Sequence, residues 1–210
     1  MLKRLAFGVL DATLSAVLAP RCAACGRVLD APLGGAVCAW CWDQARRDAP
    51  AYDGALREII HAFKYEGRRS LARPLGDLIR STRAEMLSGA ACVVPVPLYP
   101  WRRVQRGFNQ AADIARHLDV PVVHALWRVR ATAPQTGLTA AERRRNVRGA
   151  FRMSPLITTR ARRAFIEDAV VVLVDDVMTT GATMGACAEA LTASGAREVR
   201  MVAVARAILK

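Results

Sequence analysis

Residues 170–183 read VVVLVDDVMTTGAT, and this stretch decides how the rest of the chain is interpreted. It opens with five consecutive apolar residues, 170–174, a β-branched run typical of a buried parallel strand. Two carboxylates, Asp175 and Asp176, follow where that strand is expected to end. A glycine among small hydroxylated residues then opens an apolar helical stretch that ends near Gly195. The segment therefore predicts a strand, a loop and a helix N-terminus in succession.

The chemistry of this segment follows from that order. A helix N-terminus presents unpaired backbone N–H groups and a partial positive charge, and both favour a phosphate. Gly181 allows the backbone to approach an anion closely, while Asp175 and Asp176 can accept hydrogen bonds from sugar hydroxyls or hold Mg²⁺ through water. A ribose 5-phosphate offers a phosphate to the helix N-terminus and hydroxyl groups to the carboxylates. The segment resembles the phosphoribosyl pyrophosphate (PRPP) loop of type I phosphoribosyltransferases. The alternative is a buried strand with a polar turn, but two acidic residues beside three threonines exceed what a turn needs. The residues of this segment predicted to bind PRPP are Asp175, Asp176, Met178, Thr179, Thr180, Gly181, Ala182 and Thr183.

The composition bounds the class of protein. With 210 residues, 53% of them apolar, the chain can bury the core of one ordinary domain plus a small appendage. The net charge of +13 favours polyanionic partners, namely nucleic acid, phosphorylated metabolites or an acidic protein. A general preference for Arg over Lys would give the same composition without a nucleic-acid partner, and charge alone does not separate these readings. No apolar run is long enough to span a bilayer.

The N-terminal part predicts a helix followed by a metal-binding knuckle. Residues 2–18 have helical apolar spacing; their basic start imitates a signal peptide, but an acidic residue interrupts the apolar run, so a packing helix in a cytoplasmic protein is expected. Two Cys-x2-Cys pairs then stand twelve residues apart, a spacing typical of structural zinc sites. Two disulfides are the alternative, although these are usual in small secreted domains. The predicted ligands are Cys22, Cys25, Cys38 and Cys41. We expect the domains to be 1–48 and 49–210, and Cys92 and Cys187 to be core residues.

A helical stretch over residues 54–87 carries a lysine of uncertain role. Lys64 lies just before the break at Gly67, where it either reaches a diphosphate or is a solvated lysine at a helix end. His61 is expected to be a partly buried helix residue and not a base.

A second strand-to-loop transition lies at residues 91–97. Prolines end this strand, and a helix follows from about residue 111 to 118, so we expect two neighbouring parallel strands whose ligand lies across their carboxyl ends. The turn Pro95, Val96 and Pro97 would then face the same crevice as the carboxylates. Arg102 and Arg106 could bind pyrophosphate there; a surface basic patch is the alternative.

The chain from 120 to 151 predicts a strand and then an arginine-rich segment. Residues 120–130 read as an apolar strand candidate, and residues 132–151 contain little apolar content but many guanidinium groups. Such a segment is either a solvated loop or a mobile flap over a phosphate-rich ligand, and the arginines favour the flap. Residues 160–163, RARR, have no partner that the sequence reveals. A helix at 183–194 and a strand at 199–205 complete a further β-α-β unit.

Taken together, these motifs resemble the ComF family of phosphoribosyltransferase-like bacterial proteins, over about residues 20–206. The segments that carry the resemblance are the four-cysteine knuckle, residues 63–65, Pro95-Val96-Pro97, residues 106–110, Gln135 with residues 143–151, and the loop at 171–183. The resemblance implies an α/β fold: a type I phosphoribosyltransferase-like parallel sheet flanked by helices, with a small N-terminal zinc ribbon.

The resemblance also implies a function. Asp175 and Asp176 would bind ribose hydroxyls, residues 179–183 the 5-phosphate of Mg²⁺-bound PRPP, and the turn after Val94 the pyrophosphate. The family's role would be natural competence, in which internalised single-stranded DNA is handled with other competence proteins. Catalysis stays open, because nothing in the chain reads as a base-recognising element. The alternatives are a phosphoribosyltransferase acting on a nucleobase in nucleotide salvage, and a metabolite sensor whose zinc ribbon docks a partner protein.

Overall fold

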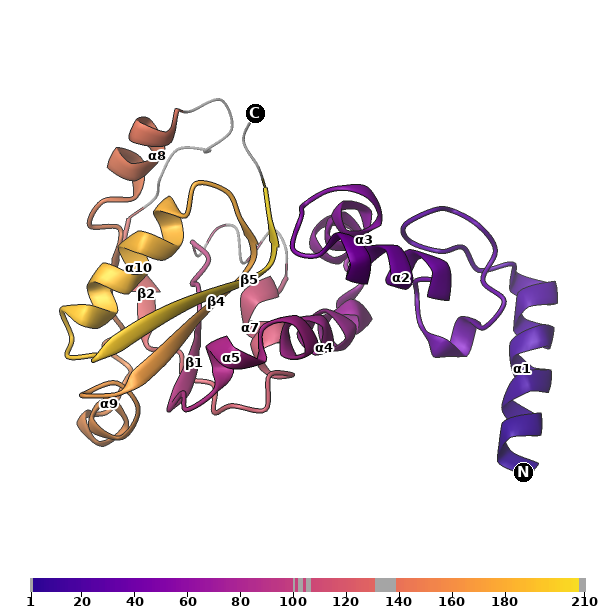
Figure 1. Ribbon diagram of the computed structural model, residues 1–210, viewed down its shortest axis with the longest axis horizontal. Coiled ribbons are helices and arrows are strands. Elements are labelled where there is room, and N and C mark those ends of the chain that lie inside the picture. Colours follow the sequence, from indigo (N-terminus) through magenta and orange to yellow (C-terminus); the bar gives the residue numbers. More distant parts are fainter. Residues whose placement is uncertain (1, 100, 102–103, 105–106, 131–138, 208–210) are drawn as a thin grey trace.

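A three-stranded parallel sheet forms the centre of the protein. The computed structural model describes the whole chain except residues 1, 100, 102–103, 105–106, 131–138 and 208–210. The strands are β1 (Cys92–Pro95), β4 (Val170–Met178) and β5 (Glu198–Arg206), in the order β1-β4-β5 with β4 in the middle (Figure 1). A single parallel bridge between Val93 and Val122 adds a short edge outside β1. The expected α/β fold with neighbouring parallel strands is confirmed.

Alternation along β4 divides the core into two clusters. Val172 and Val174 pack with helices α3 (Gly54–Tyr65), α4 (Ala72–Thr82) and α7 (Gln110–Ala115), whereas Val171 and Leu173 pack with α10 (Ala182–Thr192) on the other side. Successive side chains of a strand point to opposite faces, so a continuous apolar run requires cover on both sides. The short elements on the first side are the 3₁₀ turn η2 (Arg69–Leu71) and α5 (Ala84–Leu87).

A second, smaller sheet carries the arginine-rich part of the chain. Strand β2 (Leu126–Arg128) pairs antiparallel with β3 (Phe151–Met153), and helices α8 (Ala140–Val147) and α9 (Thr159–Phe165) follow these strands. The strand expected over residues 120–130 is therefore shorter and belongs to a different sheet. The interpretation of residues 132–151 as a loop or flap is also wrong over 139–151, which form α8, a turn and β3; residues 131–138 lie outside the described part.

The N-terminal region lies at the end of the molecule away from the sheet (Figure 1). It contains α1 (Leu2–Leu18), the 3₁₀ turn η1 (Pro32–Gly34) and α2 (Ala39–Asp48). Two hydrogen bonds link α1 to the chain that follows it: Ser15 Oγ donates to the Leu29 carbonyl at 2.5 Å, and Leu33 N–H donates to Asp11 Oδ1 at 2.8 Å. The helix expected at 2–18 is confirmed. None of the helices in the described residues combines the length and apolarity needed to cross a membrane.

Two further expectations are corrected. Strand β4 does not end at Val174 but continues to Met178, because β5 pairs with it as far as Arg206; Asp175 and Asp176 therefore lie inside the strand. His61 is exposed on α3 and not partly buried, with its ring 4.8 Å from that of Tyr65.

Candidate functional site

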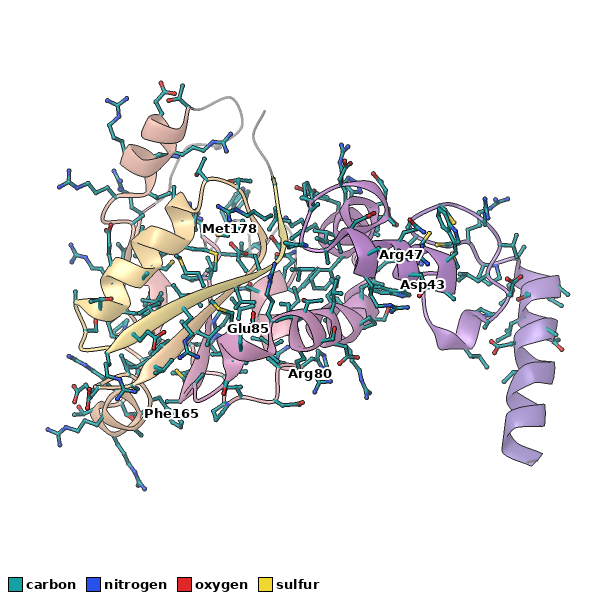
Figure 2. All side chains as sticks on the ribbon, in the orientation of Figure 1. Asp43, Arg47, Arg80, Glu85, Phe165 and Met178 are labelled. Atoms are coloured by element: carbon teal, nitrogen blue, oxygen red, sulfur yellow. The ribbon has the colours of Figure 1, made fainter. Side chains whose placement is uncertain are left out.

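The two carboxylates lie where β4 extends beyond β1. Pairing with β1 stops at Pro95 opposite Val174, so the next residues of β4 have a strand neighbour only on the β5 side. Asp176 is buried, Asp175 is half-buried, and the N–H of Asp176 donates to Asp175 Oδ1 at 2.9 Å. Met178, labelled in Figure 2, marks the carboxyl end of the strand. The sheet thus presents a carboxylate pair at the edge where ligands of parallel sheets bind.

Lys64 reaches this carboxylate pair from α3. Its Nζ lies 2.9 Å from Asp176 Oδ1, and the two side chains are only 14% and 10% exposed. Burial lowers the pKa of Lys64, but the charge and hydrogen bond of Asp176, with the charge of Asp175, outweigh it, so the pKa is raised. The lysine is therefore a buried ammonium group within the site and not a solvated helix end.

The glycine-threonine loop joins β4 to α10. Gly181 is the N-cap residue with φ of 72°, in the left-handed region that an L side chain rarely adopts. The N–H of Ala182 donates to Thr180 Oγ1 at 3.4 Å, and the other threonines of the loop, Thr179 and Thr183, are half-buried beside it. A helix N-terminus thus follows the carboxylates directly, so one edge of the sheet offers anionic groups for a diol or divalent cation and backbone donors for an anion.

The Pro95–Pro97 turn is fixed by two contacts to neighbouring elements. Val96 N–H donates to the Val174 carbonyl at 2.9 Å, and Asn109 Nδ2 donates to the Val96 carbonyl at 3.1 Å. Asn109 also caps α7, since its Oδ1 accepts from Ala112 N–H at 3.3 Å. Sequence reasoning did not assign Asn109 a role, although an Asn before an apolar helical stretch is a recognisable cap signal.

The structure brings most of the predicted residues to one edge of the sheet. The carboxylate pair, Lys64 and the start of α10 meet beside β4, and the turn after β1 is hydrogen-bonded to β4 just before Asp175. Phe63 contributes by packing against Phe108, with ring centroids 5.5 Å apart, which holds α3 next to the chain that follows the turn. Arg102 and Arg106 lie outside the described residues.

A second candidate site is the cysteine cluster. The ligand atoms of Cys22, Cys25, Cys38 and Cys41 lie within 4.8 Å of one another, and all four cysteines are free thiols, so the disulfide alternative is not what the fold forms. Burial opposes the ionisation of Cys22, but N–H donors, including those of Cys38 and Ala24, lower its pKa to about 6.

The cluster fits a thiophilic metal ion. Burial raises the pKa values of Cys38 and Cys41, so these two thiols resist ionisation unless a cation compensates the charge. Gly26 makes the tight turn of the first knuckle: its φ of 72° lies in the left-handed region, and its N–H donates to the Cys22 carbonyl at 2.9 Å. Four converging sulfur atoms on such turns could hold a metal ion in tetrahedral geometry.

Comparison with known proteins agrees with this architecture. The family model of the phosphoribosyl transferase domain matches residues 105–208. Competence protein F of Haemophilus influenzae is 34% identical over 166 residues, which cover 74% of this chain and 70% of that protein. The DNA utilization protein YhgH of Escherichia coli is 32% identical over 168 residues, covering 75% and 70%. Competence protein ComFC of Bacillus subtilis is 29% identical over 150 residues, covering 71% and 58%.

These relatives share with the chain the greater part of their length, and the matched phosphoribosyl transferase domain includes β4, its two carboxylates and the loop before α10. The chain therefore belongs to the ComF family of competence protein F.

Proposed function

We propose that this protein binds PRPP with Mg²⁺ and handles internalised single-stranded DNA in the cytoplasm during natural transformation, together with other competence proteins. The single observation that carries the PRPP half is the carboxylate pair of β4, which precedes the N-terminus of α10 and in which the buried Asp176 pairs with the ammonium group of Lys64 from α3. The names of the relatives, which refer to competence and DNA utilization, support the DNA half.

We assign a part of PRPP to each part of this edge. Asp175 and Asp176 accept hydrogen bonds from the ribose hydroxyls, because carboxylates are acceptors only and a diol offers two donors. Residues 179–183 bind the 5-phosphate through backbone N–H groups and threonine hydroxyls. The Pro95–Pro97 turn and Lys64 lie on the pyrophosphate side, where Mg²⁺ would neutralise the remaining charge. The four cysteines hold a structural zinc ion.

Calorimetric titration with PRPP and Mg²⁺ tests the PRPP half. Asp175→Asn removes one acceptor without changing the volume of the side chain, and it spares the buried ion pair of Asp176. We expect its affinity to fall at least about tenfold, as for the loss of a hydrogen bond to a charged group. The matched control is Asp168→Asn, an exposed aspartate before the amino end of the same strand, which should bind as the wild type does. Equal affinity of Asp175→Asn and wild type would contradict the assigned role.

The DNA half has its own measurement. Binding of a labelled single strand should weaken steeply as salt rises, because contacts with phosphates release counterions. Binding that does not change with salt, or no binding at all, would remove this half of the proposal while leaving the PRPP half untouched.

A further inference from the structure

A groove of about 800 Å³ lies beside the Pro95–Pro97 turn and is distinct from the carboxylate site. Its walls come from α7 and the chain before it, from β2, and from α9, where Phe165 is labelled in Figure 2. We call it the α7–α9 groove. Of those residues assigned above to PRPP that the structure describes, only Pro95 and Pro97 touch it. The volume lies in the range of small-molecule and nucleotide sites.

Large apolar side chains stand exposed in this groove. Trp127 on β2 is 44% exposed and Leu156 is 85% exposed, and both line the groove. Arg152 lies directly opposite Trp127 in the β2-β3 ladder, so the two side chains leave the same face of the pair. An exposed indole is a surface on which an unpaired base can stack.

The groove is also lined by two arginines that share one carboxylate, Arg69 and Arg116. Arg69 donates to both carboxylate oxygens of Asp113, at 2.7 and 3.1 Å, and Arg116 donates to the same carboxylate at 2.7 Å. Asp113 is 6% exposed, whereas the arginine side chains are 56% and 58% exposed. The guanidinium carbon of Arg69 also lies over the ring of Phe108, 5.3 Å from its centroid. Two cations share one anion here, so the wall keeps a net positive charge and its guanidinium groups are fixed before any ligand arrives.

We propose that the α7–α9 groove is a binding site for single-stranded nucleic acid. A base stacks on Trp127 and backbone phosphates contact Arg69 and Arg116. This inference rests on the DNA half of the proposed function and locates it. Charge complementarity favours nucleic acid as the ligand, because the wall is cationic and the chain has a net charge of +13. A second copy of this chain would be equally positive and would be repelled. The ligand must be single-stranded, because only an unpaired base presents its ring face to an indole.

The test is fluorescence anisotropy with a labelled oligothymidylate of about 20 nucleotides, a length that exceeds typical single-strand sites. Trp127→Ala should weaken binding about tenfold, and Trp127→Phe should restore part of the loss because a smaller aromatic ring remains. Arg116→Gln leaves Asp113 bound to Arg69 and should reduce the slope of log affinity against log salt by about 0.7, the value for one lost phosphate contact. A duplex of the same length should bind less tightly than the single strand.

Matched controls remove the same side chains elsewhere. Trp40 on α2 is 56% exposed and Arg57 on α3 is exposed, and neither lines the groove. Trp40→Ala and Arg57→Gln should bind the oligonucleotide within about twofold of wild type, since a single remote charge contributes little. All five variants should bind PRPP as wild type does, which shows that the fold is intact.

The outcomes separate the inference from the proposed function. If wild type binds the oligonucleotide and the groove variants bind it equally well, the groove assignment is wrong and the DNA half of the function stands. If wild type binds none, both fail. If Trp127→Ala leaves DNA binding intact but changes the sedimentation of the protein, the groove is an interface between copies of the chain, and the proposal is overturned.

Discussion

The pairing of Lys64 with Asp176 is the contact on which the candidate site depends most. The two residues stand far apart in the sequence, so the spacing of helical residues around Lys64 left its role open, and only the packing of α3 against the sheet resolves it. An ammonium group 2.9 Å from a carboxylate oxygen, with both side chains mostly buried, neutralises part of the negative charge that Asp175 and Asp176 bring together. The pair therefore stabilises the site before a ligand binds.

Replacing Lys64 should destabilise the whole protein. In Lys64→Met, Asp176 keeps its charge but loses its partner in a buried position. Removing one member of a buried ion pair costs about 3 kcal/mol of the free energy of unfolding. Urea denaturation followed by circular dichroism measures this, as a lower midpoint at unchanged slope.

A double variant provides the control for this prediction. Lys64→Met combined with Asp176→Asn removes the uncompensated charge, and we expect it to recover much of the stability that the single variant loses. A Lys64→Met protein as stable as wild type would show that the ion pair contributes nothing to folding.

Residue types at the site were predictable, and their partners were not. The carboxylates, the glycine and the threonines of residues 175–183 stand in one continuous segment whose order along the chain already specifies a strand end and a helix start. The bond of Asn109 to the Val96 carbonyl is different, because it joins two residues that are 13 positions apart in the sequence. Contacts of this kind depend on tertiary packing, which local patterns do not encode.

At the scale of elements, polar residues account for most differences between expectation and structure. Apolar periodicity correctly located α3, α10 and the buried half of β4. It ended β4 too early, because Asp175 and Asp176 break the apolar run although β5 continues to pair with β4 as far as Met178. It missed α8 because that helix is mostly charged, and its signals lie in its caps.

Both ends of α8 are capped by side chains. Thr139 Oγ1 accepts from Glu142 N–H at 3.3 Å, and Glu142 Oε2 accepts from Thr139 N–H at 2.7 Å, which is the reciprocal capping box. At the other end, Arg130 donates to the carbonyls of Asn146 and Arg148 at 3.1 and 2.9 Å. The sequence Thr-x-x-Glu was therefore a usable start signal within the segment interpreted as a loop.

Thr139→Ala should loosen α8 without unfolding the protein. Loss of an N-cap raises the population of open helix, and we expect backbone amides of α8 to exchange hydrogen about fivefold faster. Hydrogen exchange followed by mass spectrometry measures this, with Thr139→Ser as the control that keeps the hydroxyl. Unchanged exchange in Thr139→Ala would mean that packing against α10 alone holds the helix.

The same cap predicts a pH dependence. Hydrogen bonds from the hydroxyl and N–H of Thr139 lower the pKa of Glu142. A lowered pKa in the folded state means that the contribution of Glu142 is present at neutral pH and is lost as the pH falls through that lowered value. The exchange difference between Thr139→Ala and wild type should therefore shrink in acid.

At the scale of the molecule, the cysteine region and the sheet share one hydrophobic cluster. Cys22, Cys41 and Ala45 belong to the same set of buried residues as Ile59 and Phe63 of α3. Helix α3 in turn carries Lys64 into the carboxylate site. The N-terminal region is thus packed onto α3, the helix that contributes Lys64 to the candidate PRPP site.

Loss of metal should therefore lower the stability of the whole protein and not only of the cysteine region. Cys38→Ser removes one thiolate from the cluster, and structural zinc sites supply folding energy directly. We expect the variant to contain less than one equivalent of zinc by elemental analysis. Because the core is shared, its thermal unfolding should remain a single transition at a lower temperature, as should that of wild type treated with a chelator.

The control is Cys92→Ser, and the number of unfolding transitions decides between the outcomes. Cys92→Ser also replaces a buried cysteine, but one that lies in the other core cluster and outside the metal group, so it should retain zinc even if packing weakens. Two resolved transitions, with only the first sensitive to the chelator, would show that residues 1–48 unfold independently of 49–210. In that case α3 would not transmit metal loss to the carboxylate site, and PRPP affinity in Cys38→Ser should equal that of wild type.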